Sequence, residues 1–169
     1  TTQTQTLNIA NNGDCYMEVE VGESDNSTIS DIDGNVYETV QIGDQTWMAE
    51  NLKVTHYNNG DEIQYIQREE IEPNVWGNLT TGAYGYYNDD LSHQETYGNL
   101  YNWYAVDDNR GICPENWHVP SDDEWYVLTN YIGSAENSAG KLKETGNTYW
   151  EEYENILEFN SNETGFSAL

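Results

Sequence analysis

The pattern of apolar and polar positions is clearest just after the middle of the chain, where it predicts a capped helix. Three apolar side chains recur at the spacing of one helix face: Trp125, Leu128 and Ile132. Ser121 has the side chain of a good N-cap, and Glu124 lies three positions later, where it completes a capping box. Gly133 supplies a stop. We therefore expect a helix between Ser121 and Gly133.

Alternating patterns predict short strands in the first third of the chain. Residues 1–24 contain two alternating stretches separated by a turn, which predicts an N-terminal β-ribbon, and the polar residues 25–30 are interpreted as a linker. In residues 31–53, the pairs Asp33-Gly34 and Gly43-Asp44 separate short apolar stretches in a hairpin pattern. Trp117 and Val119 alternate with His118, which predicts a half-buried strand that Pro120 ends.

Two further segments have a helical pattern. In residues 97–106, Leu100, Trp103 and Tyr104 fit one helix face, and Tyr97 lies one turn earlier. Residues 138–144 predict a short second helix. Residues 53–96 are polar and rich in turns, which indicates surface loops or short irregular strands.

Composition and charge exclude several classes of partner. The 169 residues include 31 acidic and 5 basic side chains, giving a formal net charge of −26. Such a chain is repelled by nucleic acids and by anionic membrane surfaces, because both are polyanions. No apolar run approaches the roughly 20 residues that a membrane helix needs, so we expect no membrane insertion. The chain also has 14 Tyr and 6 Trp, so aromatic rings supply much of its apolar surface.

The candidate binding residues are aromatic or acidic. One interpretation is that flat aromatic rings at Tyr84, Tyr86 and Tyr87 bind a sugar or a partner protein. The favoured alternative is that these rings fill a core that is short of aliphatic residues. Trp150 is a further candidate ligand-binding residue.

Asp31, Asp33 and Asn35 resemble the start of a calcium loop, but position 42, where such a loop carries a bidentate acid, is an isoleucine. A plain turn is the favoured interpretation, with Ca²⁺ as the only candidate cofactor.

Catalytic chemistry finds no support in the sequence. The three histidines, at positions 56, 93 and 118, lack a metal-ligand spacing, and the two cysteines are far apart. With 31 acids, any pair of carboxylates can be chosen, so such pairs carry no information. We expect a protein that is not an enzyme and has no catalytic residue.

Six motifs occur in an order that resembles a known family. They are DIDGNVY (31–37), QIGDQTWMAENLK (41–53), YGNLYNWYAV (97–106), CPENWHVPSDDEW (113–125), AGKLK (139–143) and GFSAL (165–169). Together they resemble the Fibrobacter succinogenes major paralogous domain (FISUMP), a family found in exported and surface proteins, over residues 31–169. The resemblance implies an α+β, C-type-lectin-like fold, with two helices packed on a small, irregular antiparallel sheet.

The same resemblance implies a fold that is incomplete at its C-terminal end, because family members continue past the GFSAL motif. The part of the family that is missing here would carry the expected disulfide partner of Cys113. Cys15 is then its candidate partner in this chain, and whether the two are paired stays open.

The expected core residues are Trp47, Trp103, Trp117, Trp125 and Leu128. The indoles of Trp103, Trp117 and Trp125 are expected to meet in one aromatic nucleus that joins the capped helix to residues 41–53.

The resemblance, the acidic surface and the aromatic content lead to two hypotheses about function. The first is an extracellular or cell-surface module for recognition or adhesion, with a glycan or a surface protein as partner. The second is a structural subunit of an extracellular filament or surface layer, in which the N-terminal strand adds to the open sheet edge of another copy.

Overall fold

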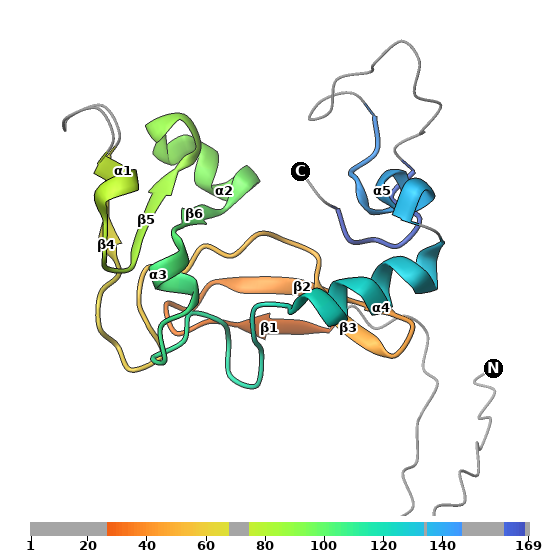
Figure 1. Ribbon diagram of the computed structural model, residues 1–169, viewed down its shortest axis with the longest axis horizontal. Coiled ribbons are helices and arrows are strands. Elements are labelled where there is room, and N and C mark those ends of the chain that lie inside the picture. Colours follow the sequence, from red (N-terminus) through yellow and green to blue (C-terminus); the bar gives the residue numbers. More distant parts are fainter. Residues whose placement is uncertain (1–26, 68–74, 134, 147–160, 168–169) are drawn as a thin grey trace, which may run out of the picture.

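The computed structural model describes residues 27–67, 75–133, 135–146 and 161–167, which form an α+β fold (Figure 1). The expected ribbon over residues 1–24, together with Cys15 and Trp150, lies outside the described residues. The elements in chain order are β1 (Thr28–Ser30), β2 (Val36–Ile42), β3 (Gln45–Met48), β4 (Gln64–Tyr65), α1 (Val75–Asn78), β5 (Ala83–Tyr86), the 3₁₀ turns η1 (Tyr87–Asp89) and η2 (Leu91–His93), α2 (Gln94–Tyr97), β6 (Asn99–Tyr101), α3 (Trp103–Val106), α4 (Asp122–Ile132) and α5 (Ala135–Leu142).

The first sheet is antiparallel, in the order β1-β2-β3. The two predicted turns are confirmed, because Gly34 lies between β1 and β2 and Gly43 between β2 and β3, both with positive φ. The linker assigned to residues 25–30 is wrong in its last three residues. These residues form β1, in which Ile29 lies opposite Tyr37. Pairing with β2 gives hydrogen-bond partners to the backbone N–H and C=O groups of a segment whose sequence indicates only a polar linker.

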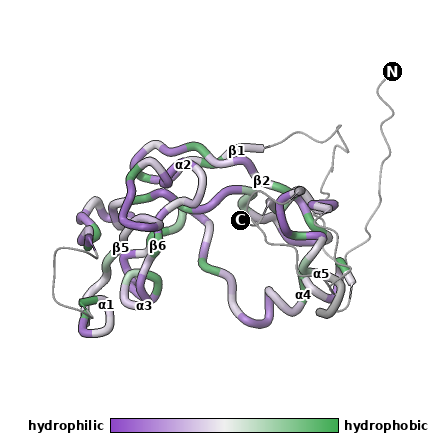
Figure 2. Tube along the Cα trace, turned by 90° about the horizontal axis from the view of Figure 1, so that it is seen from above, coloured by the Kyte–Doolittle hydropathy of each residue, from purple (hydrophilic) through white to green (hydrophobic). Residues whose placement is uncertain are grey.

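The second sheet, β4-β5-β6, is mixed: β4 runs parallel to β5, and β6 runs antiparallel to it. It lies with α1, α2 and α3 at one end of the molecule, and α4 and α5 lie at the other (Figures 1 and 2). The helix predicted over residues 97–106 is present only over its last four residues, as α3, and is wrong for residues 98–102. Gly98 has a φ of 65°, and the side-chain amide of Asn99 donates to the carbonyl of Lys53 at 2.9 Å, so tertiary contacts draw the following residues into β6.

Helix α4 confirms the capped-helix prediction. Ser121 is its N-cap, both hydrogen bonds of the capping box with Glu124 are present, and Gly133 is its C-cap. Leu128 and Ile132 are its buried residues. The second predicted helix is also present, as α5, although it begins earlier than the predicted range.

The strand predicted at Trp117–Val119 is wrong, since these residues form no strand. The backbone N–H of Trp117 donates to the carbonyl of Pro114 at 2.9 Å, and Asn116 has a φ of 67°. The chain therefore turns tightly at residues 114–117, just before the predicted strand; residues 117–119 pair with no strand in the described part of the chain, and Val119 is left 43% exposed.

Two separate apolar clusters stabilise the described fold. One underlies the second sheet and contains Val54, Tyr57, Ile63, Tyr84, Ala105 and Ile112. The other joins the first sheet to α4 and contains Ile42, Trp47, Leu128 and Ile132, so the core roles predicted for Trp47 and Leu128 are confirmed.

The single aromatic nucleus expected around Trp103, Trp117 and Trp125 is not formed. Helix α3 is one turn long and buries Ala105, which leaves the Trp103 side of that turn facing solvent, 68% exposed. Trp125 does reach the first sheet, through Trp47, although it is 39% exposed itself. Trp117 is half-buried and forms no ring contact with another aromatic residue in the described part of the chain.

Candidate functional site

A groove of about 690 Å³ lies beside β3, and we take it as the candidate binding site. One wall consists of the continuous residues 44–52, which include all of β3. The opposite wall consists of residues 116–120 and Cys113 with the first turn of α4, and Phe166 and Ser167 lie at one end. Residues distant in sequence therefore meet at one edge of the first sheet.

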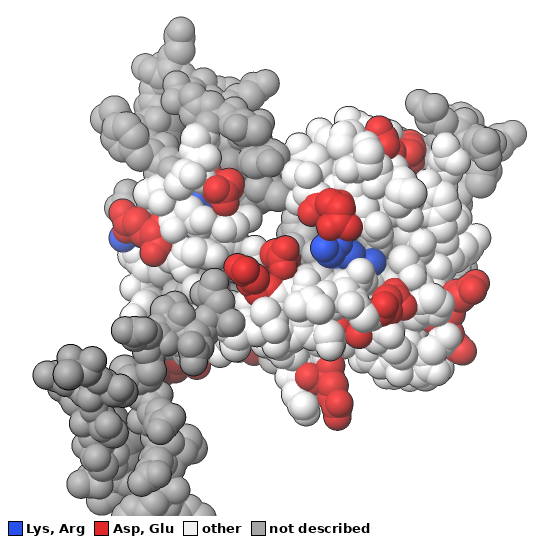
Figure 3. All heavy atoms as spheres, turned by 180° about the vertical axis from the view of Figure 1, so that it is seen from behind, with Lys and Arg blue, Asp and Glu red and all other residues white. Residues whose placement is uncertain are grey.

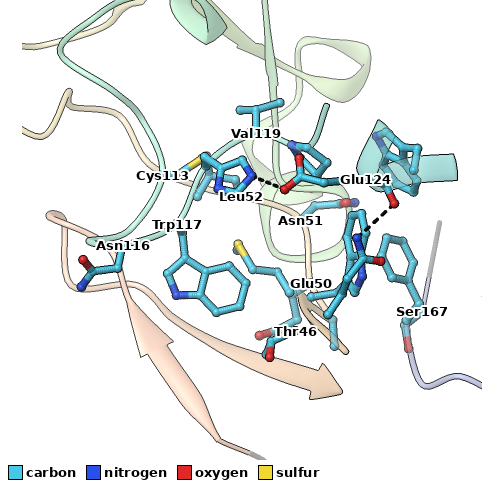
Figure 4. A pocket seen from close by; sticks show the side chains of 18 of the residues that line it. Thr46, Glu50, Asn51, Leu52, Cys113, Asn116, Trp117, Val119, Glu124 and Ser167 are labelled. Atoms are coloured by element: carbon cyan, nitrogen blue, oxygen red, sulfur yellow. Dashed lines mark hydrogen bonds and ion pairs between the residues drawn. The ribbon is translucent and has the colours of Figure 1, made fainter. Parts of the chain in front are cut away.

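Aromatic rings give the groove its apolar character. The ring centroids of Trp47 and Trp125 are 4.8 Å apart, and Phe166 packs against both, at 5.7 and 6.0 Å. The indole of Trp117 extends from the opposite wall toward the side of the groove where Thr46 and Glu50 lie (Figure 4). Two partly exposed indoles, of Trp117 and Trp125, are therefore available to a flat or apolar group of a ligand.

Two buried polar atoms in the groove wall have no hydrogen-bond partner among the described residues: the indole nitrogen of Trp47 and the side-chain oxygen of Gln45. The other side-chain atom of Gln45 is bonded, since Nε2 donates to the backbone carbonyl of Glu124 at 3.2 Å. This bond joins β3 to the first turn of α4, so the two walls are held together at one end of the groove (Figure 4).

Three titratable side chains in the wall formed by residues 113–125 are engaged in local structure or buried. Glu124 accepts from the backbone N–H of Ser121 at 2.8 Å and from its hydroxyl at 2.7 Å, and its other oxygen lies 2.7 Å from Nε2 of His118. These bonds, led by those from Ser121, lower the pKa of Glu124 to about 2. Burial raises the pKa of the Cys113 thiol, which makes it a weak nucleophile. Glu124 and Cys113 are therefore poorly suited to act as a general base or a nucleophile.

The tyrosines predicted to bind ligand lie away from this groove. Tyr84 is only 8% exposed and packs in the second sheet with Tyr65, Tyr86 and Tyr101, at centroid distances of 5.5 to 6.4 Å. Burial raises its pKa. This arrangement agrees with the favoured alternative, in which tyrosines fill a core that lacks aliphatic residues.

Tyr87 is more exposed than Tyr84 but is packed locally, 4.7 Å from Tyr97 and 5.5 Å from His93. Trp150, the remaining candidate, lies outside the described residues.

Asp31, the first of the predicted calcium ligands, organises a turn between β1 and β2. Its carboxylate is buried and accepts four hydrogen bonds, from the backbone of Asp33 and Asn35, the side chain of Asn35 and the hydroxyl of Tyr37. In the described part of the chain, no three His, Cys, Asp or Glu side chains form a group that could hold a metal.

Asp33 points away from Asp31 toward residues 55 and 56. Partial burial opposes its ionisation, but hydrogen bonds from Thr55 and His56 outweigh this effect and lower its pKa. The three predicted ligands therefore take part in one turn, yet the carboxylates of Asp31 and Asp33 do not converge on a common point, and the side chain of Asn35 donates to Asp31.

Cys113 is a free, half-buried cysteine, and its proposed partner Cys15 lies outside the described residues, so the disulfide remains a prediction. Acidic groups are spread over the face seen in Figure 3, with basic groups in small spots. No helix in the described ranges has the length and apolarity to cross a membrane.

Comparison with known proteins identifies one family. The family model described as Fibrobacter succinogenes major domain matches residues 40–169. Neither the curated proteins nor the solved structures contain a match to the chain.

Proposed function

Because the chain belongs to the Fibrobacter succinogenes major domain family, we propose that it is a non-enzymatic recognition module, exported to the cell surface or beyond, that binds its ligand in the groove beside β3. The observation that carries this proposal is that the partly exposed indoles of Trp117 and Trp125 line one open groove together with the exposed polar side chains of Thr46, Asn51 and Asn116. A mostly apolar site with a few fixed polar groups is typical of ligand binding.

The state of the titratable groups supports binding without catalysis. Glu124 is committed to the helix cap, and the Cys113 thiol is held protonated by burial. His118 is the groove's remaining titratable ring, and it is paired with Glu124. Of the other carboxylates that line the groove, Glu50 accepts from the backbone N–H of Glu38, and Asp44 lies in the exposed turn before β3.

The C-type-lectin-like core and the location outside the cell are part of the same proposal. Packing of α4 on the β1-β2-β3 sheet through Leu128 and Trp47 supports a helix-on-sheet core of this kind. The net charge of −26 supports a partner that is neutral or basic, since an acidic partner would be repelled.

A binding screen with two indole variants tests the proposal. The purified protein is applied to a glycan array and to an immobilised library of extended peptides, and each hit is measured by calorimetry with Trp117→Ala and Trp103→Ala. We expect Trp117→Ala to weaken binding by at least about tenfold, roughly 1.4 kcal/mol. Trp103→Ala is the control, because Trp103 is 68% exposed and lies on α3, outside the groove.

Two results would contradict the proposal: no hit on either surface, or hits whose affinity is unchanged by Trp117→Ala.

A further inference from the structure

The outer edge of β3 carries unpaired backbone groups that face the groove. In the β2–β3 ladder, Trp47 lies opposite Val40, and the N–H of Ala49 donates to the carbonyl of Glu38 at 2.9 Å. Residues of an antiparallel strand alternate between directing their backbone at the partner strand and away from it. The N–H and C=O groups of Thr46 and Met48 therefore point away from β2, and within the described residues they have no hydrogen-bond partner.

The groove lies along this same edge. Residues 44–52 line it, whereas among the described residues no part of β2 does, so the open space is on the side of β3 opposite β2. The edge also lacks the usual protection against pairing, since Thr46 and Met48 are uncharged and β3 contains no proline. An added strand would form hydrogen bonds with the backbone of this edge. It would also contact the indoles of Trp117 and Trp125, which form the aromatic wall of the groove.

Charge limits which strand can enter. Asp44, Glu50 and Glu124 line the groove, and a second copy of this protein carries a net charge of −26, so most of its surface is repelled. Residues 1–13 are an exception, because they contain no Asp, Glu, Lys or Arg. Within them, threonines alternate with glutamines, a β-branched pattern that favours an extended strand, and Leu7 and Ile9 share one face.

We propose that residues 1–10 of one copy add as a strand to the β3 edge of a second copy, with Leu7 and Ile9 toward the aromatic wall of the groove. The inference rests on the proposed function, in that it names the partner for the same groove. Ala10 and Thr28 are 18 residues apart, a span of at most roughly 60 Å, which allows the segment to reach a neighbouring molecule. Donor segment and acceptor edge are different surfaces, so repeated addition produces an open chain of copies.

Complementary variants test this mode of assembly. The donor-only protein carries Met48→Pro, which removes an edge N–H that faces away from β2, and the acceptor-only protein lacks residues 1–10. By analytical ultracentrifugation, we expect the full chain to form species that lengthen with concentration and each variant alone to remain monomeric. An equimolar mixture of the two should form a one-to-one dimer and nothing larger.

A second pair of variants leaves the folded part of the protein untouched. Leu7→Glu with Ile9→Glu places two charges on the face directed at the groove, and Asn8→Glu places one charge on the other face. The double variant should abolish assembly, whereas Asn8→Glu should weaken it by less than about threefold. A synthetic peptide of residues 1–10 should bind the acceptor-only protein and should bind about tenfold more weakly after Thr46→Pro.

The outcomes separate this inference from the proposed function. If the full chain is monomeric at all concentrations, or if the peptide fails to bind the acceptor-only protein, strand exchange between copies is wrong. If the screen nevertheless finds another ligand that depends on Trp117, the recognition function stands alone. A monomeric full chain whose acceptor-only form binds the peptide would show that the segment occupies its own edge, which also overturns exchange between copies.

Discussion

The indole rings of Trp47 and Trp125 lie 4.8 Å apart at an interplanar angle of 42°, joining β3 to the first turns of α4. Trp47 is almost fully buried, whereas Trp125 is 39% exposed toward the groove. The same pair therefore closes the core between sheet and helix and forms part of the candidate binding surface.

Truncation of Trp125 should destabilise the protein. Trp125→Ala removes the ring that covers Trp47 and Phe166, and because the side chain is partly exposed, we expect a loss of about 2 kcal/mol rather than the larger cost of a fully buried tryptophan. Urea denaturation measures the difference. Tyr126→Ala is the matched control, since the adjacent Tyr126 is 68% exposed, and an equal loss in both variants would contradict the packing described.

The success and failure of sequence-based prediction can be followed at two neighbouring helical patterns. Helix α4 was predicted with its caps because Ser121, Glu124 and Gly133 act within a few residues of the helix they delimit. Residues 97–106 have a comparable apolar spacing, yet they divide into the end of α2, β6 and α3. There the deciding contacts come from Lys53 and Val54, more than 40 residues away, and no local pattern reveals them.

The groove was not predicted as a site for the same reason. Trp117 and Trp125 were expected in the core, and which strand of the sheet forms its edge depends on the order β1-β2-β3, a property of the whole fold. The alternation at Trp117–Val119 predicts a half-buried strand, so the local sequence does not indicate an exposed groove wall there.

Acid should weaken the cap of α4 through Glu124. The pKa of this carboxylate is lowered in the folded protein to about 2 from its ordinary value of 4.5, so its ionised form stabilises folding above about pH 4.5, and that contribution is lost as the pH falls toward 2. The melting temperature of Glu124→Gln should therefore lie below that of the wild type at pH 7 and converge with it near pH 2.

Because protonation of 31 acids also reduces charge repulsion, the comparison uses the difference between each variant and the wild type. Glu115→Gln is the control, because Glu115 is an exposed residue of the preceding segment. Its melting temperature should differ little from that of the wild type at both pH values. A constant difference for Glu124→Gln across this pH range would contradict the role assigned to its charge.

Asp31 should stabilise the protein without calcium. Asp31→Ala leaves four donors without their acceptor, including the fully buried hydroxyl of Tyr37, and we expect a loss of about 3 kcal/mol in chemical denaturation. Asp44→Ala, in the exposed turn before β3, should cost less than about 0.5 kcal/mol.

Adding millimolar CaCl₂ should leave the melting temperature of the wild type unchanged, since both oxygens of Asp31 are already engaged. A rise with calcium that Asp31→Ala abolishes would establish a metal site at this turn.

Gly98 should tolerate no side chain. Its φ is 65°, and a Cβ there would lie 2.6 Å from Cβ of Asn51 and 2.7 Å from the carbonyl oxygen of Leu52. We expect Gly98→Ala to cost roughly 3 kcal/mol, combining backbone strain with the clash. Gly60 is the matched control, because its φ is also positive, at 88°, but an added Cβ would have no atom within 4 Å. Gly60→Ala should therefore cost only about 1 kcal/mol. Equal costs for the two variants would show that the close approach of residues 51 and 52 to Gly98 is not maintained.

Amide hydrogen exchange at β3 tests most directly whether the open edge of this strand accepts an added strand in the groove. In the protein lacking residues 1–10, the amides of Trp47 and Ala49, directed at β2, should exchange slowly, and those of Thr46 and Met48 should exchange much faster. On addition of the peptide of residues 1–10, we predict that Thr46 and Met48 become protected while Trp47 and Ala49 change little. Slow exchange at all four amides without peptide, or unchanged exchange at Thr46 and Met48 with saturating peptide, would contradict strand addition at this edge.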